Sequence, residues 1–173
     1  MLLSPVQNTA VMEMQWIQKR PRISQHFGLN PQIYSQFGMK GHNGIDFGIP
    51  VGTKIFASEH GVCRIKDSGE AGYGLHVKVR NPYKGSECVY AHLSRVVVPD
   101  GHTVNPGDLI GYSGNTGFST GPHLHFGRRL LKPGAEDALW AWEVLDHGNG
   151  FYGYYDCIDQ LITFKGTYLK NNL

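Results

Sequence analysis

Three short histidine-containing segments combine residue types that can bind a metal ion and move protons. They are GHNGID (41–46), YAHL (90–93) and GPHLH (121–125). A catalytic zinc ion typically has three protein ligands drawn from His, Asp, Glu and Cys, and it keeps one coordination position for water. Imidazole also suits proton transfer, because its unperturbed pKa lies near neutral pH. The three segments together point to water-activating metal chemistry.

The first segment places His42 and Asp46 four residues apart. On a helix, this spacing would put both side chains on one face. Gly41 and Gly44 make a helix at this point unfavourable. The alternative is a loop that enters a strand and curves so that both side chains converge, with glycine supplying the unusual backbone angles.

The third segment has the His-Leu-His alternation of a strand. In a strand, residues i and i+2 point to the same face, about 6.5 Å apart at about 3.3 Å per residue. We therefore expect His123 and His125 to face one side, with one of them on the metal and the other beside it. Spacing alone does not decide which of the two binds the metal. His92 lies in the strand-like run VYAHL and can supply a further imidazole.

The framework that holds these residues is expected to consist of strands. The chain has 173 residues, 23 of them glycine, and short apolar runs alternate with turn residues from Ile23 to about Leu131. This pattern is typical of many short strands and not of a helix bundle. The strand-like runs are IFASEHGVCRI (55–65), LHVKVRN (75–81), ECVYAHL (87–93) and HLHFGRRL (123–130). NPYKGSE (81–87) has the composition of a hairpin connection. We predict an all-β, largely antiparallel core.

The pattern changes after residue 134. AEDALWAWEVL (135–145) contains good helix formers, with acidic residues in its first turn, and predicts a short helix. We expect Trp140 and Trp142 in this segment to pack against the core and not to bind substrate. The aromatic tail FYGYYDCIDQLITF is expected to pack back on the sheet.

The pattern predicts one domain, because no internal repeat or low-complexity linker divides the chain. Residues 1–20 form a lead segment with little pattern, and residues 21–173 form the domain. Residues 132–173 are its C-terminal extension.

Charge and cysteine content exclude several classes of protein. The formal net charge is +2, and the basic residues form no long run of the kind that binds nucleic acid. Cys63, Cys88 and Cys157 are odd in number and widely spaced, so neither a thiolate metal site nor a disulfide framework is indicated. The sequence has no stretch of about 18 apolar residues, so no membrane span is expected. The first 20 residues lack the order of a signal peptide, so we expect a chain made soluble in the cytoplasm.

The order of the motifs resembles that of the lysostaphin-like zinc endopeptidases of bacteria and phages. The likeness runs from about Ile23 to Phe126 and rests on GHNGIDFGIPVGTKIFA, GVCRI, GYGLHVKV, YAHLS, VNPGDLIGYSGNTG and STGPHLHF. The resemblance implies a partly open antiparallel barrel with a duplicated hybrid motif. It also implies five site residues. Three of them, His42, Asp46 and His125, would hold one zinc ion per chain. The other two, His92 and His123, would be catalytic imidazoles.

The function that the resemblance implies is hydrolysis of peptide bonds in peptidoglycan stems or cross-bridges. The protein would act as a monomer at the bacterial cell wall, and a phage lysin would fit the expected lack of a signal peptide. Loops around residues 28–41, 94–106 and 112–121 would form the walls of a groove for an extended peptide, with zinc on its floor.

Three other functions compete with this interpretation. A non-catalytic wall-binding or structural module on the same fold is disfavoured, because every expected metal and catalytic position is retained. A biotin- or lipoyl-carrier domain would need a modifiable lysine in VNPGDLIG, which has none. A D-Ala–D-Ala carboxypeptidase of the other zinc class would need a wider spacing than that of His42 and Asp46.

Overall fold

The computed structural model describes residues 21–159, so the expected lead segment and the end of the tail lie outside the described residues. Within this range the strands are β1 (Arg22–Gln25), β2 (Ile45–Gly48), β3 (Lys54–Phe56), β4 (Gly61–Asp67), β5 (Leu75–Asn81), β6 (Ser86–Ala91), β7 (Leu93–Val96), β8 (Thr103–Val104), β9 (Leu109–Ser113), β10 (Leu124–Leu130) and β11 (Tyr154–Tyr155). The helical segments are α1 (Pro31–Tyr34) and the 3-10 helices η1 (Ser35–Phe37), η2 (Glu136–Ala141) and η3 (His147–Asn149). None of the helices in residues 21–159 has the length and apolar character that a membrane span requires.

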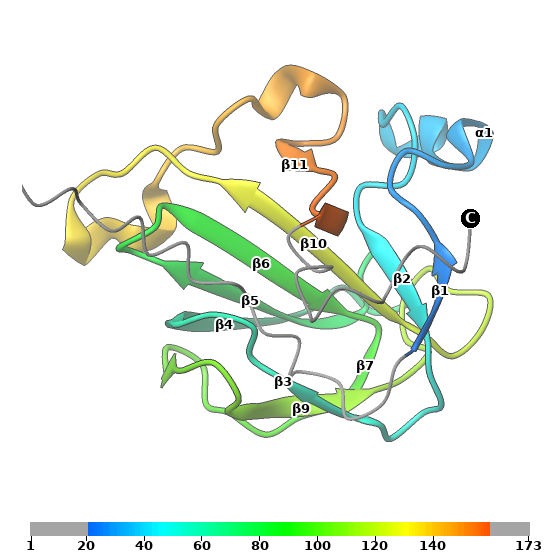
Figure 1. Ribbon diagram of the computed structural model, residues 1–173, viewed down its shortest axis with the longest axis horizontal. Helices are drawn as coiled ribbons and strands as arrows, with labels where there is room; N and C mark the ends of the chain where they lie inside the picture. The colour runs from blue at the N-terminus through cyan, green and yellow to red at the C-terminus, as the bar shows by residue number, and fades with distance from the viewer. Residues whose placement is uncertain (1–20, 160–173) are drawn as a thin grey trace, which may run out of the picture.

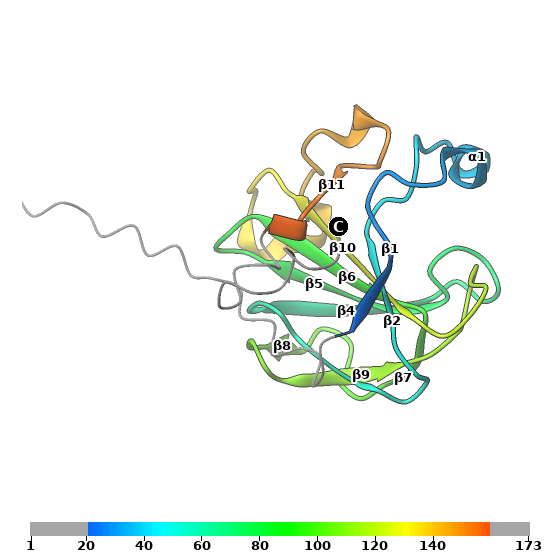
Figure 2. The same ribbon diagram turned by 45° about the vertical axis from the view of Figure 1, so that its right-hand side comes forward.

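The strands form two antiparallel sheets (Figure 1). The larger sheet has the order β1-β2-β10-β6-β5-β4-β8, and β11 pairs with β10 outside this path. The smaller sheet, β3-β9-β7, lies below it in Figures 1 and 2. The large sheet ends at β1 and β8 and does not close on itself, which agrees with the expected partly open, all-β architecture. β10 takes a central place, between β2 and β6.

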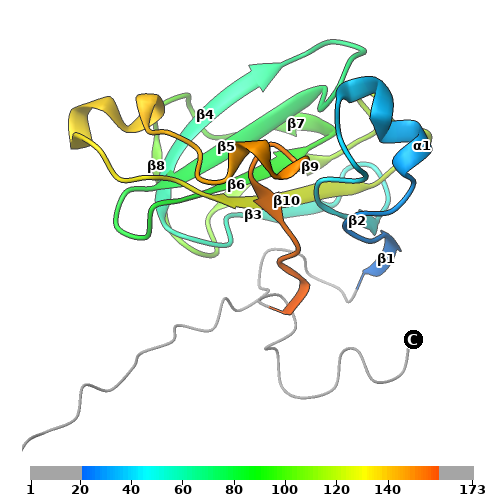
Figure 3. The same ribbon diagram turned by 90° about the horizontal axis from the view of Figure 1, so that it is seen from above.

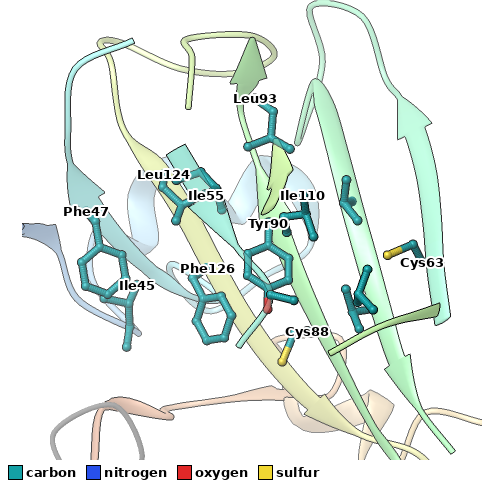
Figure 4. Packing of buried hydrophobic residues seen from close by; sticks show 14 of the residues in the cluster. Ile45, Phe47, Ile55, Cys63, Cys88, Tyr90, Leu93, Ile110, Leu124 and Phe126 are labelled. Carbon is teal, nitrogen blue, oxygen red and sulfur yellow. The ribbon is translucent and has the colours of Figure 1, made fainter. Parts of the chain in front are cut away.

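The main core joins apolar side chains of both sheets. Ile55 and Ile110 come from the small sheet, and Tyr90 and Phe126 come from the large one (Figure 4). The rings of Tyr90 and Phe126 lie 5.3 Å apart in an edge-to-face contact, which is a favourable geometry for aromatic pairs. Every residue of β6 is buried, because a second cluster that includes Tyr154 covers its other face. The aromatic tail therefore packs on the sheet as expected, as far as residue 159.

The connections follow the turn chemistry of the sequence in one case and depart from it in another. Residues 82–85 join β5 to β6 as expected, and Asn81 Oδ1 accepts hydrogen bonds from the backbone N–H groups of Tyr83 and Lys84. The run 55–65 is not one strand, however. It breaks between Phe56 and Gly61, so that β3 joins the small sheet and β4 joins the large one.

The short helix expected over residues 135–145 is wrong in type and length. The segment forms the 3-10 helix η2, which ends at Ala141, and Trp142 has an extended ψ of 134°. Arg80 Nη1 donates to the carbonyl of Leu139 at 2.8 Å, which competes with the bonds that would continue a helix. The next residues pair with the end of β10, where Lys132 N–H donates to the Glu143 carbonyl at 2.9 Å.

The two tryptophans of this segment are packing residues, as expected. Trp142 is 6% exposed and packs with Leu131 and Leu139. The guanidinium groups of Arg64 and Arg80 lie over the ring of Trp140, at 4.3 and 4.8 Å from its centroid. Neither tryptophan lines the groove described below.

A buried charge network ties β10 to its neighbours in the large sheet. Glu87 on β6 is fully buried, and its two carboxylate oxygens meet Arg80 Nε at 2.6 Å and Arg129 Nη2 at 2.7 Å. Lys78 Nζ lies 3.6 Å from the same carboxylate. Burial alone would raise the pKa of Glu87, but the charges of Lys78, Arg129 and Arg80 outweigh it and hold the pKa below its usual value. Positive side chains therefore surround this carboxylate.

Candidate active site

His42 and Asp46 lie where a loop enters β2. The backbone N–H of His42 donates to the Leu29 carbonyl at 2.9 Å, and the His42 carbonyl accepts from Gly28 N–H at 2.8 Å. Gly44 lies directly against β10, since a Cβ at this position would come within 2.5 Å of both His125 Cε1 and the Phe126 carbonyl oxygen. The loop-to-strand alternative is therefore confirmed. The unusual backbone angles expected of its glycines are wrong, because neither Gly41 nor Gly44 has a positive φ. Both glycines serve close approach instead, since a Cβ on Gly41 would clash with the Gly28 carbonyl oxygen in the same way.

Strand register brings His125 to this pair. β2 and β10 are antiparallel neighbours, and Asp46 lies directly opposite His125. Asp46 Oδ1 is 3.0 Å from His42 Nε2 and 3.0 Å from His125 Nδ1. The two ring nitrogens are 2.9 Å apart. All three residues are buried, and their ligand atoms lie within 4.8 Å of one another.

The hydrogen bonding of this cluster is suited to a cation. His42 Nδ1 donates to the His26 carbonyl at 3.1 Å, so its inward-facing Nε2 carries a lone pair in the neutral ring. Asp46 Oδ1 is a second acceptor aimed at the same point. His125 Nδ1 can supply one hydrogen at most, and in that tautomer its buried Nε2, which has no partner among the described residues, is left unsatisfied. Two imidazoles and one carboxylate are also the ligand types that zinc accepts.

The pKa values within the cluster follow from burial and from contact among its members. Burial alone would raise the pKa of Asp46, but hydrogen bonds from His125 and His42 outweigh it and hold the pKa far below its usual value. Burial lowers the pKa of His125, although Asp46 opposes this effect. The carboxylate is therefore ionised and His125 favours its neutral form, which is the state in which both bind metal.

His92 reaches the site from the junction of two strands and not from within a strand. β6 ends at Ala91, and His92 has a left-handed backbone with φ of 60°. The strand-like interpretation of VYAHL is wrong at this residue. Gly114 lies against the turn, since a Cβ there would approach the His92 carbonyl oxygen to 2.8 Å. His92 Nδ1 donates to the Thr116 carbonyl at 2.7 Å, so this loop contact orients the ring.

His123 lies beside His92, just before β10 begins. Its Nδ1 donates to the Gly121 carbonyl at 2.8 Å, and its Nε2 is 3.7 Å from Asp46 Oδ2. The rings of His92 and His123 are 4.5 Å apart. Burial, followed by His125 and His123 as neighbours, lowers the pKa of His92 to about 3. Both histidines thus have Nδ1 engaged by a backbone carbonyl, which leaves Nε2 without a backbone partner.

These five residues lie along a groove of about 500 Å³. One wall comes from residues 33–39 and the other from residues 118–123, as expected for the loops 28–41 and 112–121. Residues 94–106 do not line the groove, so this part of the expectation is wrong. They contain β7 and β8, and β8 pairs with β4 at the opposite edge of the large sheet from β1. The remaining lining comes in part from Tyr73 and Tyr152.

Several polar and aromatic groups of the site were not expected from the sequence. Tyr34 stacks 5.3 Å from His42, and its hydroxyl accepts from Gln25 Nε2 at 3.1 Å. Burial, with the charge of Asp46, raises the pKa of Tyr34 to about 12. Tyr73 packs 5.1 Å from His125. Tyr34 ends α1 and Tyr73 lies in the turn before β5, and no regular spacing links either tyrosine to the histidine segments.

The cysteines take no part in the site. Cys63, Cys88 and Cys157 are free and buried within the described residues. Burial raises the pKa of Cys63 and of Cys157 to about 12, so both thiols stay protonated at neutral pH.

Comparison with known proteins adds to this geometry. The model of peptidase family M23 matches residues 40–137. The DD-carboxypeptidase/endopeptidase Mpg of Neisseria meningitidis is 41% identical over 111 residues, which are 63% of this chain and 24% of Mpg. The chain thus spans about a quarter of the length of this curated relative.

Two solved structures are similar in fold. The catalytic domain of the antimicrobial peptidase lysostaphin from Staphylococcus simulans superposes with a TM-score of 0.59 and 26% identity, covering 80% of this chain and 90% of that domain. A zinc-containing peptidase from Vibrio cholerae gives a TM-score of 0.56 and 26% identity, covering 66% of this chain and 35% of the peptidase. The two-sheet arrangement described above is therefore the lysostaphin-like fold.

Proposed function

The chain belongs to peptidase family M23, and on this basis we propose that it is a zinc-dependent endopeptidase that hydrolyses peptide bonds in peptidoglycan stems or cross-bridges. One observation carries the proposal: His42, Asp46 and His125 converge on one point at the floor of a groove. The name of the Mpg relative, which includes endopeptidase activity, supports the reaction class.

Three atoms would hold one zinc ion per chain: His42 Nε2, Asp46 Oδ1 and His125 Nδ1. The chemistry that zinc supplies in such a site is Lewis acidity, which lowers the pKa of water to about 7 and polarises a peptide carbonyl. The rest of the reaction falls to groups of the chain. The hydrogen bond from His42 Nδ1 to the His26 carbonyl fixes the orientation of the first ligand, as is usual for metal-binding histidines.

His92 and His123 are proposed as the catalytic imidazoles, which orient the attacking water and move its proton. Each donates its Nδ1 hydrogen to a backbone carbonyl, so the neutral ring presents the lone pair of Nε2. The lone pair of His123 can accept a proton from the attacking water, and its imidazolium can then donate it to the leaving amine. The lowered pKa of His92 keeps that ring neutral, so its lone pair suits a hydrogen bond from the attacking water that orients it. The carboxylate of Asp46 lies 3.7 Å from His123 Nε2 and would stabilise the imidazolium. Donation from the protonated Nε2 of His123 would also stabilise the developing oxyanion.

The charge of the groove favours an endopeptidase over a carboxypeptidase. Among the described residues that line it, none is Lys or Arg, and Asp46 is the one carboxylate. A terminal carboxylate is usually recognised by a charged, bidentate donor such as arginine. A groove without such a donor suits an internal segment of uncharged peptide backbone. This feature supports cleavage within a cross-link.

The setting is part of the same proposal. The protein would act as a monomer at the bacterial cell wall, where its proposed substrate lies. Its use as a phage lysin stays a prediction. A non-catalytic module on the same fold is the alternative, and the complete set of metal and imidazole side chains speaks against it.

The test is a cleavage assay on purified cell walls of several cross-link chemistries. The zinc-loaded protein should bind one zinc per chain and release fragments with a new amino group at one class of peptide bond, identified by mass spectrometry. His42→Ala should lose both zinc and fragment release. The matched control His102→Ala, at an exposed histidine outside the groove, should keep both. A wild-type protein that binds zinc but cleaves no wall would contradict the proposal.

A further inference from the structure

A segment beyond the matched family region lies against one wall of the groove. The family model ends at residue 137, and residues 146–155 follow it. Figure 3 shows this segment crossing the large sheet near β10, beside the loop that carries α1. Lys40 N–H donates to the Gly150 carbonyl at 2.9 Å, and the rings of Phe27 and Phe151 lie 4.5 Å apart. The segment therefore contacts the wall through both backbone and side chains.

Tyr152 makes the contact nearest to the groove. Its hydroxyl donates to the Phe37 carbonyl at 2.6 Å. Its side chain also lines the groove, and Tyr152 is 40% exposed. A Cβ on Gly38 would lie 3.2 Å from the same hydroxyl, so the wall passes closely over the tyrosine. One side chain thus both supports the wall and forms part of the groove surface.

Phe37, which Tyr152 supports, joins the two walls. Its ring lies 5.2 Å from the ring of Phe118 in an edge-to-face contact. Phe37 belongs to the first wall and Phe118 to the second, and Phe118 is 44% exposed. Together with Tyr152 they form an aromatic, uncharged end of the groove, which we name the aromatic subsite (Phe37, Phe118 and Tyr152).

Hydrogen bonds from the large sheet and within the segment itself fix residues 149–153 in place. Arg129 Nη1 donates to the Tyr152 carbonyl at 3.2 Å, and Arg129 is anchored by Glu87 in the buried charge network. Asn149 Oδ1 accepts from the backbone N–H groups of Phe151 and Gly153. Tyr152 has a left-handed backbone with φ of 54°, a conformation that non-glycine residues keep only where the surroundings impose it.

From these contacts we propose that Tyr152 is a positioning residue for substrate, which places Phe37 and Phe118 so that the aromatic subsite takes an uncharged, apolar part of the peptide. The substrate half of this inference rests on the proposed peptidase function. Segment 146–155 is then a third wall of the groove, supplied from outside the matched family region. Among the described residues, Tyr152 makes no hydrogen bond or ring contact with the five metal and imidazole residues, so its effect falls on binding of the substrate.

The experiment compares Tyr152→Phe with wild type. This substitution removes the hydroxyl that supports Phe37 and keeps the ring. We expect KM for soluble cross-linked muropeptides to rise about threefold to tenfold, the effect of one lost hydrogen bond, with kcat within about twofold of wild type. Tyr152→Ala removes the ring as well and should raise KM further. Tyr83→Phe is the matched control, because Tyr83 is 82% exposed and lies outside the groove.

A second measurement is independent of catalysis. Hydrogen exchange of a peptide covering residues 34–42, measured by mass spectrometry on the zinc-free protein, should be faster in Tyr152→Phe and unchanged in Tyr83→Phe. Equal KM and equal exchange in Tyr152→Phe and wild type would overturn the inference. A drop in kcat at unchanged KM would also overturn it. A wild type that cleaves no wall would refute the peptidase proposal, and the exchange comparison would still decide whether Tyr152 positions the wall.

Discussion

Two carboxylates are buried in the large sheet, and their surroundings differ in one decisive respect. Glu87 meets Arg80, Arg129 and Lys78, so permanent positive charges balance it. Asp46 meets imidazoles, which can be neutral and which present more lone pairs than hydrogens to the shared point. The first arrangement is electrostatically complete without any ligand. The second would be balanced by the proposed zinc ion, and this difference separates a structural ion pair from a candidate metal site.

The largest expected effect is that of Asp46→Asn, which keeps the shape of the side chain and removes its charge. The comparison predicts that zinc binding is lost and that fragment release falls to background, because one of three ligands is missing. Zinc content by mass spectrometry and the cell-wall assay provide the readout. Asp137→Asn, at an exposed aspartate, is the control. Retention of one zinc per chain in Asp46→Asn would mean that Asp46 is an ordinary ion-pair partner.

His123→Ala should separate metal binding from catalysis. His123 lies outside the three-residue cluster, so we expect zinc content to stay at the wild-type level. Loss of a proton-transfer group should lower kcat about 10²- to 10⁴-fold. A near-normal turnover in this variant would refute the role proposed for His123, whatever the zinc content.

Glu87→Gln tests the other member of the comparison. The substitution leaves Arg80 and Arg129 buried without their counter-charge, which should lower the free energy of unfolding by about 3–5 kcal/mol. Zinc affinity at a temperature where the variant is folded should not change. Urea denaturation gives the free energy of unfolding. The control is Glu143→Gln, because the Lys132–Glu143 pair is exposed and such pairs contribute about 0–1 kcal/mol. Equal losses in the two variants would contradict the contrast between buried and exposed pairs.

The smallest expected effect is on the pH dependence of the free energy of unfolding. The pKa of Glu87 is lower in the folded than in the unfolded chain, in which a glutamate titrates near about 4.3. Its contribution to stability is therefore complete above that value and is lost as the pH falls through the folded pKa. We expect the free energy of unfolding, measured with urea between about pH 3 and 7, to differ between wild type and Glu87→Gln. The difference should be constant at the upper end of this range and should become smaller at the lower end. A difference in the free energy of unfolding that grows on acidification would contradict a lowered pKa of Glu87 in the folded chain.

The β core was predictable because its signals are local. Alternating runs and turn residues such as those of 81–87 place strands and hairpins within a few residues of one another. The glycine signal at Gly44 also indicated the loop that enters β2. The segment 135–145 was not predictable in the same way. The helix propensity of its residues is overridden by the hydrogen bonds that Arg80 and the residues at the end of β10 make with its backbone.

The candidate site was predictable in its residue types and only partly in its geometry. The pairing of Asp46 with His125 joins residues 79 positions apart, and no spacing within either segment contains that register. Register also distinguishes His125, which lies opposite Asp46, from His123, which precedes the strand. The left-handed backbone of His92 and the positions of Tyr34 and Tyr152 depend on loops whose packing is set by distant segments.

Both of the compared carboxylates are served by a single strand, β10, which supplies His125 to one and Arg129 to the other. Since successive side chains of a strand point to opposite faces, a slip of one residue would turn Leu124 toward His42 and Asp46. The same slip would move Arg129 away from Glu87. Insertions and deletions between residues 124 and 130 should therefore be excluded from the natural variation of this protein.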